Sequence, residues 1–231
     1  MKLFAKNKVA EDIFDVNVLD DPGSGIDFTL VDPRATEKDI KSMLDIACDN
    51  RYYAAIVSPV HVRFARDYID QKLSGTLKLG TVIGFPLGGS TTKSKIAEAK
   101  DAIRSGADEL DVVVAIGKIK DGDFGYVKHE MQRIVRLKRK VVVKAIIETA
   151  YLSPEEIEKV VHALVKARVD YIMTSTGYAP LGADIETVEK LITLTNRTGV
   201  LVKASGGIKT KAQAENLFRV GVARVGTSRI I

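Results

Sequence analysis

Residues 141–148 read VVVKAIIE, residues 153–156 read SPEE, and residues 171–175 read YIMTS. The first and last stretches are short apolar runs rich in β-branched residues, which is typical of parallel strands buried on both faces. In the middle stretch the serine is a suitable N-cap, the proline suits the first helical position, and the acids favour the positive end of a helix dipole. This part of the chain therefore predicts a strand, a helix and a second strand.

The same alternation of short apolar runs and amphipathic stretches continues in both directions along the chain. One such stretch, residues 36–51, repeats apolar residues at Ile40, Met43, Leu44 and Ala47, the spacing of a helix face. Further helices are predicted at 94–105, from Ser153 onward, at 184–198 and at 210–220. The predicted strands are Ile26–Leu30, Ala54–Ser58, Leu77–Phe85, Leu110–Ile116, Val141–Glu148, Tyr171–Ser175, Leu201–Ala204 and Ala223–Gly226.

Eight strands with helices between them indicate a (β/α)8 barrel formed by residues 1–231 as one domain. The competing fold is an open, doubly wound sheet, but no GxGxxG follows the first strand and no GxxxxGK[ST] occurs. Residues 1–20 are predicted to form a helix that covers the bottom of the barrel. No helix follows the last predicted strand, so we expect the final helical layer to be absent, or supplied by the N-terminal segment or a partner subunit.

The composition narrows the class of protein. The chain has 231 residues, of which 45% are hydrophobic and 28% charged, with a net charge of +5 and a pI near 9.1. The basic residues are spread over predicted helices, except for 136–140, so the charge fits an anionic small substrate better than a nucleic acid. No apolar run is long enough for a membrane span, no signal peptide is recognised, and the single cysteine, Cys48, permits no internal disulfide; we therefore expect a cytoplasmic protein.

In a barrel of this kind the loops after the strands carry the functional site. The last three strands end in small, hydroxylic and glycine-rich segments, whose backbone N–H groups and hydroxyls suit a phosphate group. Turns between strand and helix would explain any one of these glycines, but three neighbouring loops of this type favour phosphate binding. The predicted phosphate-binding residues are Thr176, Gly177, Ser205, Gly206, Gly207, Gly226, Thr227 and Ser228.

Lysine is uncommon inside a buried strand, because an unpaired charge is costly to bury. Lys144 lies within VVVKAIIE and Lys203 within LVKAS, while Asp111 lies within ELDVVVAIG. An ion-paired lysine would explain each position, but two amines near one carboxylate also suit proton transfer. A neighbouring cation and partial desolvation would both lower the pKa of an amine, as catalysis by lysine requires. Asp111, Lys144 and Lys203 are therefore the candidate catalytic residues.

Metal chemistry is not indicated, and no cofactor is expected. His61, His129 and His162 are scattered along the chain, and no spacing of His, Asp or Glu resembles a metal cluster. Of the three, only His61 follows a predicted strand and could approach the site. Cys48 falls near the apolar face of the first barrel helix, where a core role explains it better than a nucleophilic one.

Motifs along nearly the whole chain resemble the deoxyribose-phosphate aldolase family. They are IDFTLVDPRAT (26–36), GTVIGFPLGGSTTKSKIAEA (80–99), GADELDVVVAIG (106–117), VVVKAIIETAYL (141–152), VDYIMTSTGYAP (169–180), VKASGGIKT (202–210) and ARVGTS (223–228). The resemblance implies a (β/α)8 barrel and metal-independent Schiff-base chemistry, in which 2-deoxyribose 5-phosphate is cleaved to glyceraldehyde 3-phosphate and acetaldehyde. It also implies a role in deoxyribonucleotide catabolism.

The resemblance assigns roles to individual residues. Asp111 matches the proton-relay aspartate, Lys203 matches the lysine that helps to keep the imine-forming amine unprotonated, and Lys144 matches a lysine of the fifth strand. The imine-forming lysine itself is expected directly before TSTG, where this chain has Met173, which has no nucleophilic nitrogen. Five further positions depart from the pattern: Phe28 for histidine, Asp32 for lysine, Ile56 for cysteine, and Ser58 and Ala115 for asparagine.

Three functions are compatible with these residues. The first is an aldolase whose imine forms on Lys203 or Lys144 instead of position 173. The second is a phosphosugar lyase or isomerase that uses Asp111 and the two lysines for acid–base work without an imine. The third is a protein that binds a phosphosugar without converting it. In each case the partner is a small phosphorylated sugar or aldehyde, and association of the chain with itself is compatible with the sequence.

Overall fold

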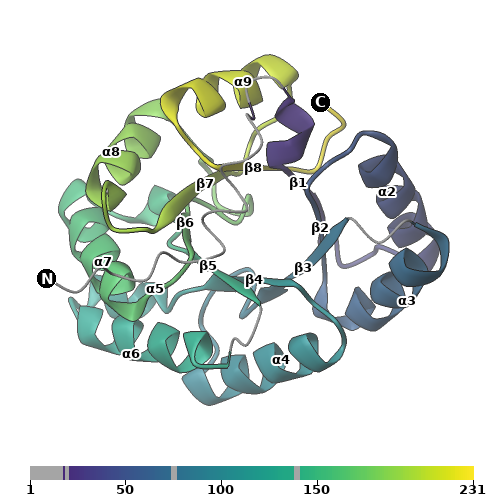
Figure 1. The fold of residues 1–231 in the computed structure, drawn as a ribbon. Helices are drawn as coiled ribbons and strands as arrows, with labels where there is room; N and C mark the ends of the chain where they lie inside the picture. Colours follow the sequence, from purple (N-terminus) through teal and green to yellow (C-terminus); the bar gives the residue numbers. More distant parts are fainter. Residues whose placement is uncertain (1–17, 19–20, 74–76, 138–140) are drawn as a thin grey trace, which may run out of the picture.

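The computed structural model describes residues 18, 21–73, 77–137 and 141–231, and its strands form one closed parallel barrel (Figure 1). Each strand pairs with the next along the chain, and β8 closes the ring on β1. The predicted (β/α)8 barrel is thus confirmed, and the open sheet is excluded. The strands are β1 (Ile26–Leu30), β2 (Ala54–Val57), β3 (Lys78–Ile83), β4 (Glu109–Val113), β5 (Val142–Ile146), β6 (Tyr171–Met173), β7 (Leu201–Ser205) and β8 (Arg224–Thr227).

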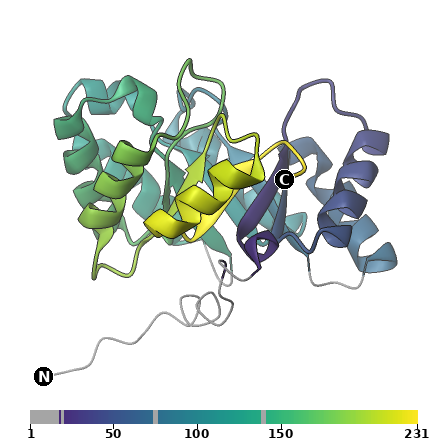
Figure 2. The same cartoon turned by 90° about the horizontal axis from the view of Figure 1, so that it is seen from above.

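Helices surround the strands and cover their outer faces (Figures 1 and 2). The start of α7 follows from its sequence: the Ser153 side chain accepts from the Glu156 N–H, and Glu156 accepts in return from the Ser153 N–H, which forms a capping box. Equivalent boxes begin α2 and α9. The α-helices are α2 (Glu37–Asp49), α3 (Val62–Lys72), α4 (Thr92–Arg104), α5 (Ile116–Lys120), α6 (Phe124–Val135), α7 (Pro154–Ala167), α8 (Ile185–Thr195) and α9 (Lys211–Val220).

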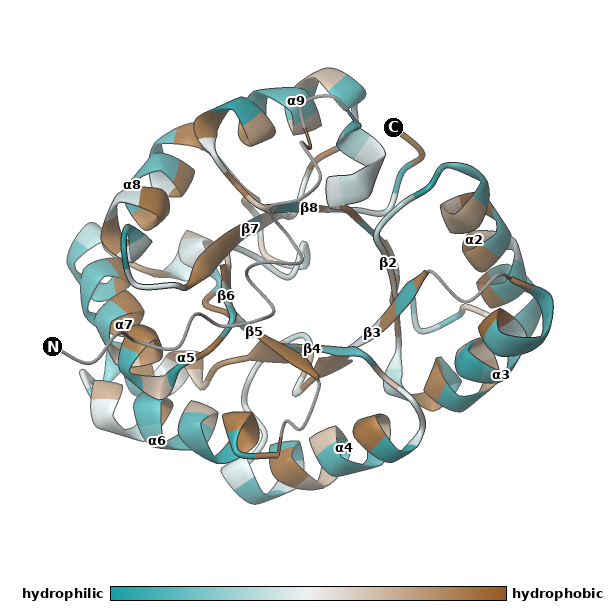
Figure 3. Cartoon of the chain, in the orientation of Figure 1, coloured by the Kyte–Doolittle hydropathy of each residue, from teal (hydrophilic) through white to brown (hydrophobic). Residues whose placement is uncertain are grey.

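The main hydrophobic core lies between the helices and the outward-facing side of the strands. Helix α7 contributes Ile157, Val160, Val161 and Leu164 from one face, all buried. In Figure 3 the helices alternate between brown and teal along their length, as helices with one buried face do. This packing leaves the inward-facing side chains of the strands as a separate layer, and that layer contains the charged residues.

Several predicted strand ends are wrong, for a common reason. Apolar residues continue beyond the last ladder pair because the loops above the barrel are themselves packed. Ile116, predicted in a strand, begins the short helix α5, and Glu148, also predicted in a strand, has a left-handed φ of 52° and starts a turn. In the other direction, Glu109 and Thr227 belong to strands although the prediction stops short of them.

The arc of the ring between α9 and α2 contains the end of the chain and the 3-10 helix Pro22–Gly25, but no α-helix among the described residues (Figure 1). Tyr52 holds the last residue there: its hydroxyl donates to the Ile231 carbonyl at 3.0 Å and accepts from the Ile231 N–H at 3.1 Å. The helix predicted for residues 1–20 lies outside the described residues, apart from Val18, and stays a prediction.

Candidate active site

Six charged side chains fill the interior of the barrel. Asp27 from β1, Glu109 and Asp111 from β4, Lys144 from β5, Lys203 from β7 and Arg224 from β8 are all buried. Three cations thus face three carboxylates, and the cluster is neutral as a whole. Asp27 is its centre, since its carboxylate accepts from Lys144, Lys203 and Arg224.

Each lysine of this cluster is held by more than one carboxylate. Lys144 Nζ lies 3.0 Å from Asp27, 2.5 Å from Glu109 and 2.9 Å from Asp111. Lys203 Nζ lies 2.6 Å from Asp27 and 2.7 Å from Asp111. The three candidate catalytic residues thus lie together: three carboxylates take the three N–H groups of Lys144, whereas two carboxylates contact Lys203.

Arg224 lies on the side of the cluster that faces away from the mouth of the barrel. Its guanidinium donates to Asp27 and, at 2.8 Å, to Glu109. The guanidinium carbon also lies 3.3 Å from the centre of the Tyr53 ring, a cation–π arrangement. Sequence reasoning did not single out Glu109 or Arg224; the available signal was a charged residue inside a short buried strand, the same signal that identified the lysines.

The electrostatics of the cluster favour its charged forms. Burial alone would raise the pKa of Asp27, but Arg224, Lys144 and Lys203 outweigh burial and lower that pKa. The pKa of Asp111 is lowered in the same way, against burial, by the two lysines. Burial would lower the pKa of Lys144, yet Asp111, Asp27 and Glu109 together raise it well above its ordinary value. The expectation of a lowered pKa is therefore wrong for Lys144, because three carboxylates surround it.

These shifts predict how stability depends on pH. Asp27 and Asp111 stabilise the fold at pH values above the ordinary aspartate pKa of about 4. This contribution is lost as the pH falls from there through their lowered pKa values. Lys144 contributes below its ordinary pKa and loses that contribution only when the pH rises through its raised value. Urea denaturation should accordingly show a fall in the free energy of unfolding below about pH 4. The Asp27→Asn variant, which lacks one titrating group, should lose less between about pH 5 and pH 3; an equal loss would contradict this role of Asp27.

An apolar layer separates the charged cluster from the mouth of the barrel. Val113, Ile146 and Met173 form it, each two residues beyond the inward-facing Asp111, Lys144 and Tyr171 of the same strands. Phe85 and Ile116 pack against this layer from the loops above. Met173, the position at which the resemblance places a lysine, therefore has hydrocarbon neighbours on this side.

A cavity of about 570 Å3 opens above this layer at the C-terminal ends of β1, β6, β7 and β8. It brings together all eight predicted phosphate-binding residues, together with Met173 and Tyr178. Lys144, Lys203 and Asp111 do not line it. Lys203 lies just beneath, because Gly226 has no side chain there: a Cβ at Gly226 would be 3.1 Å from Lys203 Cε.

The glycines of the predicted phosphate loops fix the shape of the cavity. Gly177, Gly206 and Gly207 all have positive φ, between 77° and 89°. The loops after β6 and β7 are joined where the Ala183 N–H donates to the Gly206 carbonyl at 3.1 Å, and a Cβ on Gly182 would be only 2.1 Å from that oxygen. Glu148 fixes the loop after β6, because its carboxylate accepts from the N–H and the hydroxyl of Thr176.

Free donors remain around the rim of the cavity. Among the described residues, no hydrogen-bond acceptor is found for the N–H groups of Gly177, Gly207 and Ser228. The hydroxyls of Thr176, Ser205 and Thr227 behave differently, because each donates to the protein itself. The backbone N–H groups and Ser228 are therefore the better candidates for anion contacts.

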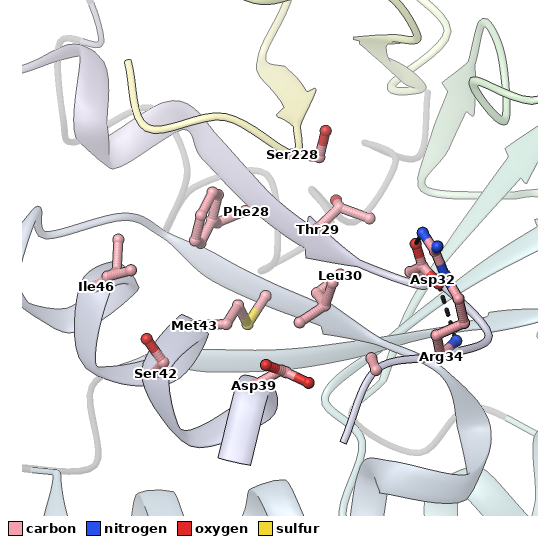
Figure 4. Close-up of a pocket in the computed structure, with 11 residues that line it drawn as sticks. Phe28, Thr29, Leu30, Asp32, Arg34, Asp39, Ser42, Met43, Ile46 and Ser228 are labelled. Carbon is pink, nitrogen blue, oxygen red and sulfur yellow. Dashed lines mark hydrogen bonds and ion pairs between the residues drawn. The ribbon is translucent and has the colours of Figure 1, made fainter. Parts of the chain in front are cut away.

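A second cavity, of about 540 Å3, lies on the outer side of β1 against α2 (Figure 4). Phe28, Leu30, Met43 and Ile46 form its apolar part, and the Asp32–Arg34 ion pair lies at its other end. Phe28, which departs from the family pattern, thus faces outward and packs on Tyr52 rather than lining the mouth. This cavity lies at the arc of the ring between α9 and α2, where the described part of the chain places no α-helix.

The remaining candidates lie away from the mouth cavity. His61 contacts the Ala35 carbonyl at 3.2 Å and does not line the cavity. His129 and His162 lie on α6 and α7. Within the described residues no group of His, Cys, Asp or Glu has an arrangement that could hold a metal ion, and no helix is long and apolar enough to cross a membrane.

Comparison with known proteins places this barrel in a family. A family model described as DeoC/LacD family aldolase matches residues 13–224. The chain is 42% identical to the deoxyribose-phosphate aldolase of Thermococcus kodakarensis over 205 residues, 88% of this chain and 91% of the relative. It is 41% identical to that of Clostridium botulinum strain Langeland over 203 residues, 88% of this chain and 94% of the relative.

Solved structures agree with these relatives. The deoxyribose-phosphate aldolase of Aeropyrum pernix, described as a tetramer, has a TM-score of 0.84 and 33% identity, covering 97% of this chain and 94% of that one. An aldolase named QR15 has a TM-score of 0.84 and 36% identity, covering 89% of this chain and 90% of that one. The chain belongs to the DeoC/LacD family of aldolases.

Proposed function

We propose that this protein binds a small phosphorylated sugar or aldehyde in the mouth cavity and does so without forming an imine. The observation that carries the proposal is the set of free N–H groups of Gly177, Gly207 and Ser228 around the cavity. Lys209 and Arg229, which follow the same loops, add positive charge at the rim. Met173 supports binding without an imine, because with methionine at this position β6 contributes no amine to the cavity wall.

A change in melting temperature on adding ligand tests the proposal. At a ligand concentration one hundred times Kd, 2-deoxyribose 5-phosphate or glyceraldehyde 3-phosphate should stabilise the fold by about 2.7 kcal/mol, or roughly 5–10 °C. Unphosphorylated 2-deoxyribose should give no shift. Ser228→Asp, which places a carboxylate at the rim, should abolish the shift, whereas Ser42→Asp on α2 should preserve it. No shift with any phosphorylated compound would overturn the proposal.

A second candidate function is retro-aldol cleavage of 2-deoxyribose 5-phosphate, the reaction associated with the names of the relatives. The observation in its favour is Lys203, whose side chain reaches the underside of Gly226 at the cavity floor. For this reaction Lys203 would have to leave Asp27 and Asp111 and attack the substrate carbonyl as a free amine. Borohydride reduction in the presence of acetaldehyde would then add mass to the peptide containing Lys203; an unmodified protein excludes this candidate.

The tetramer described for the A. pernix relative supports association of this chain with itself. Light scattering coupled to size-exclusion chromatography measures the number of chains in the assembly directly.

A further inference from the structure

Three hydroxyl groups in the wall of the mouth cavity have their protons directed to the protein and their oxygens open. They donate as follows: Thr29 to the Asp27 carbonyl at 3.2 Å, Ser205 to the Ser175 carbonyl at 2.6 Å, and Thr176 to the Glu148 carboxylate. Of the three oxygens, only that of Thr176 accepts a hydrogen bond from another described residue, the Tyr178 N–H at 3.1 Å. A hydroxyl oxygen has two lone pairs, so each still offers one to a donor on a ligand.

Asp32 adds a carboxylate to the same wall, beyond the end of β1. Arg34 holds it in place: Asp32 Oδ1 accepts from the Arg34 N–H at 2.9 Å and from Nε at 3.0 Å, and Oδ2 accepts from Nη2 at 2.8 Å (Figure 4). These bonds lower the pKa of Asp32 to about 2, so its carboxylate is ionised at neutral pH. Oδ2 accepts one hydrogen bond where its lone pairs permit two, and it can therefore accept a donor from a ligand.

The countercharge of Asp32 lies outside the mouth cavity. Arg34 lines only the outer cavity against α2, whereas Asp32 lines both cavities. The Arg34 side chain is 88% exposed, so water and salt screen its charge, while the Asp32 side chain is 39% exposed. A ligand in the mouth cavity therefore meets the carboxylate of this ion pair rather than its guanidinium.

The cations of the mouth cavity come from other loops. Lys209 and Arg229 follow β7 and β8, as do Gly207 and Ser228, whose free N–H groups are proposed above to bind phosphate. A phosphate group held by these loops leaves Asp32 and the three open hydroxyl oxygens to contact the rest of the ligand.

On the basis of that proposed phosphate binding, we infer that Asp32 is a specificity-determining residue of the mouth cavity, which favours phosphosugars with hydroxyl groups on the carbons away from the phosphate and rejects those with a second acid there. A ligand hydroxyl can donate to Asp32, to Thr29 and to the other open oxygens. A ligand carboxylate has no proton to donate, and it would lie beside an ionised group of the same sign. Rejection of this kind rests on a repulsive contact as well as on an attractive one.

Isothermal titration of the full chain with a matched pair of ligands tests the inference. D-erythritol 4-phosphate and 4-phospho-D-erythronate differ only at carbon 1, which is an alcohol in the first and a carboxylate in the second; inorganic phosphate is the third probe. We expect the alcohol to bind at least about tenfold more tightly than the acid. The net charge of the protein, +5, would by itself favour the acid, so general attraction cannot produce this preference.

The possible results separate the two proposals. Equal binding of alcohol and acid, tighter binding of the acid, or binding of inorganic phosphate alone overturns the inference and leaves phosphate binding intact. Binding of none of the three probes overturns both proposals.

A charge reversal locates the preference. Asp32→Lys places an ammonium group at this position, so the acid should become the tighter ligand by about tenfold. Asp32→Asn keeps an acceptor oxygen without the charge and should bring the two affinities to within about threefold of each other. Asp101→Lys makes the same change of net charge at an exposed position outside the cavity and should keep the original preference.

Melting curves establish that these variants fold. If folded Asp32→Lys keeps the full preference for the alcohol, or if Asp101→Lys abolishes that preference, position 32 does not select the ligand and the inference is wrong. If Asp32→Lys does not fold, Asp32→Asn decides: an unchanged ratio of the two affinities overturns the inference.

Discussion

Asp27→Asn is expected to lower the free energy of unfolding by about 3–5 kcal/mol and the melting temperature by about 6–20 °C. The reason is the position of this carboxylate between Lys144, Lys203 and Arg224, all fully buried. An asparagine has one acceptor oxygen and turns an NH2 group toward these cations, and the cluster is left with one uncompensated positive charge. Urea denaturation and thermal melting followed by circular dichroism measure the loss.

Two further variants separate this effect from a general sensitivity to substitution. Asp101→Asn removes an acid of the same type from an exposed pair with Arg104, where both side chains are 74% exposed, and should cost no more than about 0.5–1 kcal/mol. Asp27→Asn combined with Arg224→Met restores neutrality inside the barrel, so its loss should be at least about 1 kcal/mol smaller than the sum of the two single losses. Strict additivity would show that the charges are not coupled as their distances indicate.

The fold could be predicted from the sequence because parallel strands buried on both faces leave a plain signal. Runs such as 141–148 are apolar apart from Lys144 and Glu148, and helix starts such as Ser153 satisfy their own N–H groups locally. The ends of the strands could not be predicted as well. Whether a residue such as Ile116 continues a strand or begins a helix depends on which loop packs above it, and that packing is a tertiary property.

Three of the six residues of the buried charged cluster were predictable from the sequence, and the balance of charge around them was not. Asp111, Lys144 and Lys203 do lie together, as charged residues in buried strands require. The number of carboxylates around each amine could not be read from the sequence, because Glu109 and Asp27 come from other positions and Arg224 completes the balance. Those partners decide the sign of the pKa shift of Lys144: with one carboxylate and two amines it would fall, and with three carboxylates it rises.

Met173→Lys is expected to create an imine-forming amine where the present chain has none. Residue 173 pairs with Lys203 on β7 and has only 7% of its surface exposed. A lysine there would be partly desolvated among Val113 and Ile146 and would lie above two buried ammonium groups, and both effects lower the pKa of an amine below about 10.4. A larger fraction would then be the neutral nucleophile near pH 7, and its nitrogen would face the cavity that residue 173 lines.

Acetaldehyde and borohydride provide the measurement. The neutral amine adds to the aldehyde carbon, water leaves, and the reduced imine retains an ethyl group on residue 173, which peptide mass spectrometry locates. Residue 173 should be labelled in this variant and not in the unaltered chain, whose methionine has no amine, and the rate of labelling should rise with pH through the lowered pKa. Met173→Gln, which carries an amide nitrogen of no nucleophilic character, should remain unlabelled.

If Met173→Lys is labelled and also cleaves 2-deoxyribose 5-phosphate, the remaining residues are still competent for the aldol reaction. If it is labelled and cleaves nothing, the changes at Ile56 and Ala115 are the next to reverse, because Phe28 faces away from the mouth. If it is not labelled at all, residue 173 does not present its side chain to the cavity.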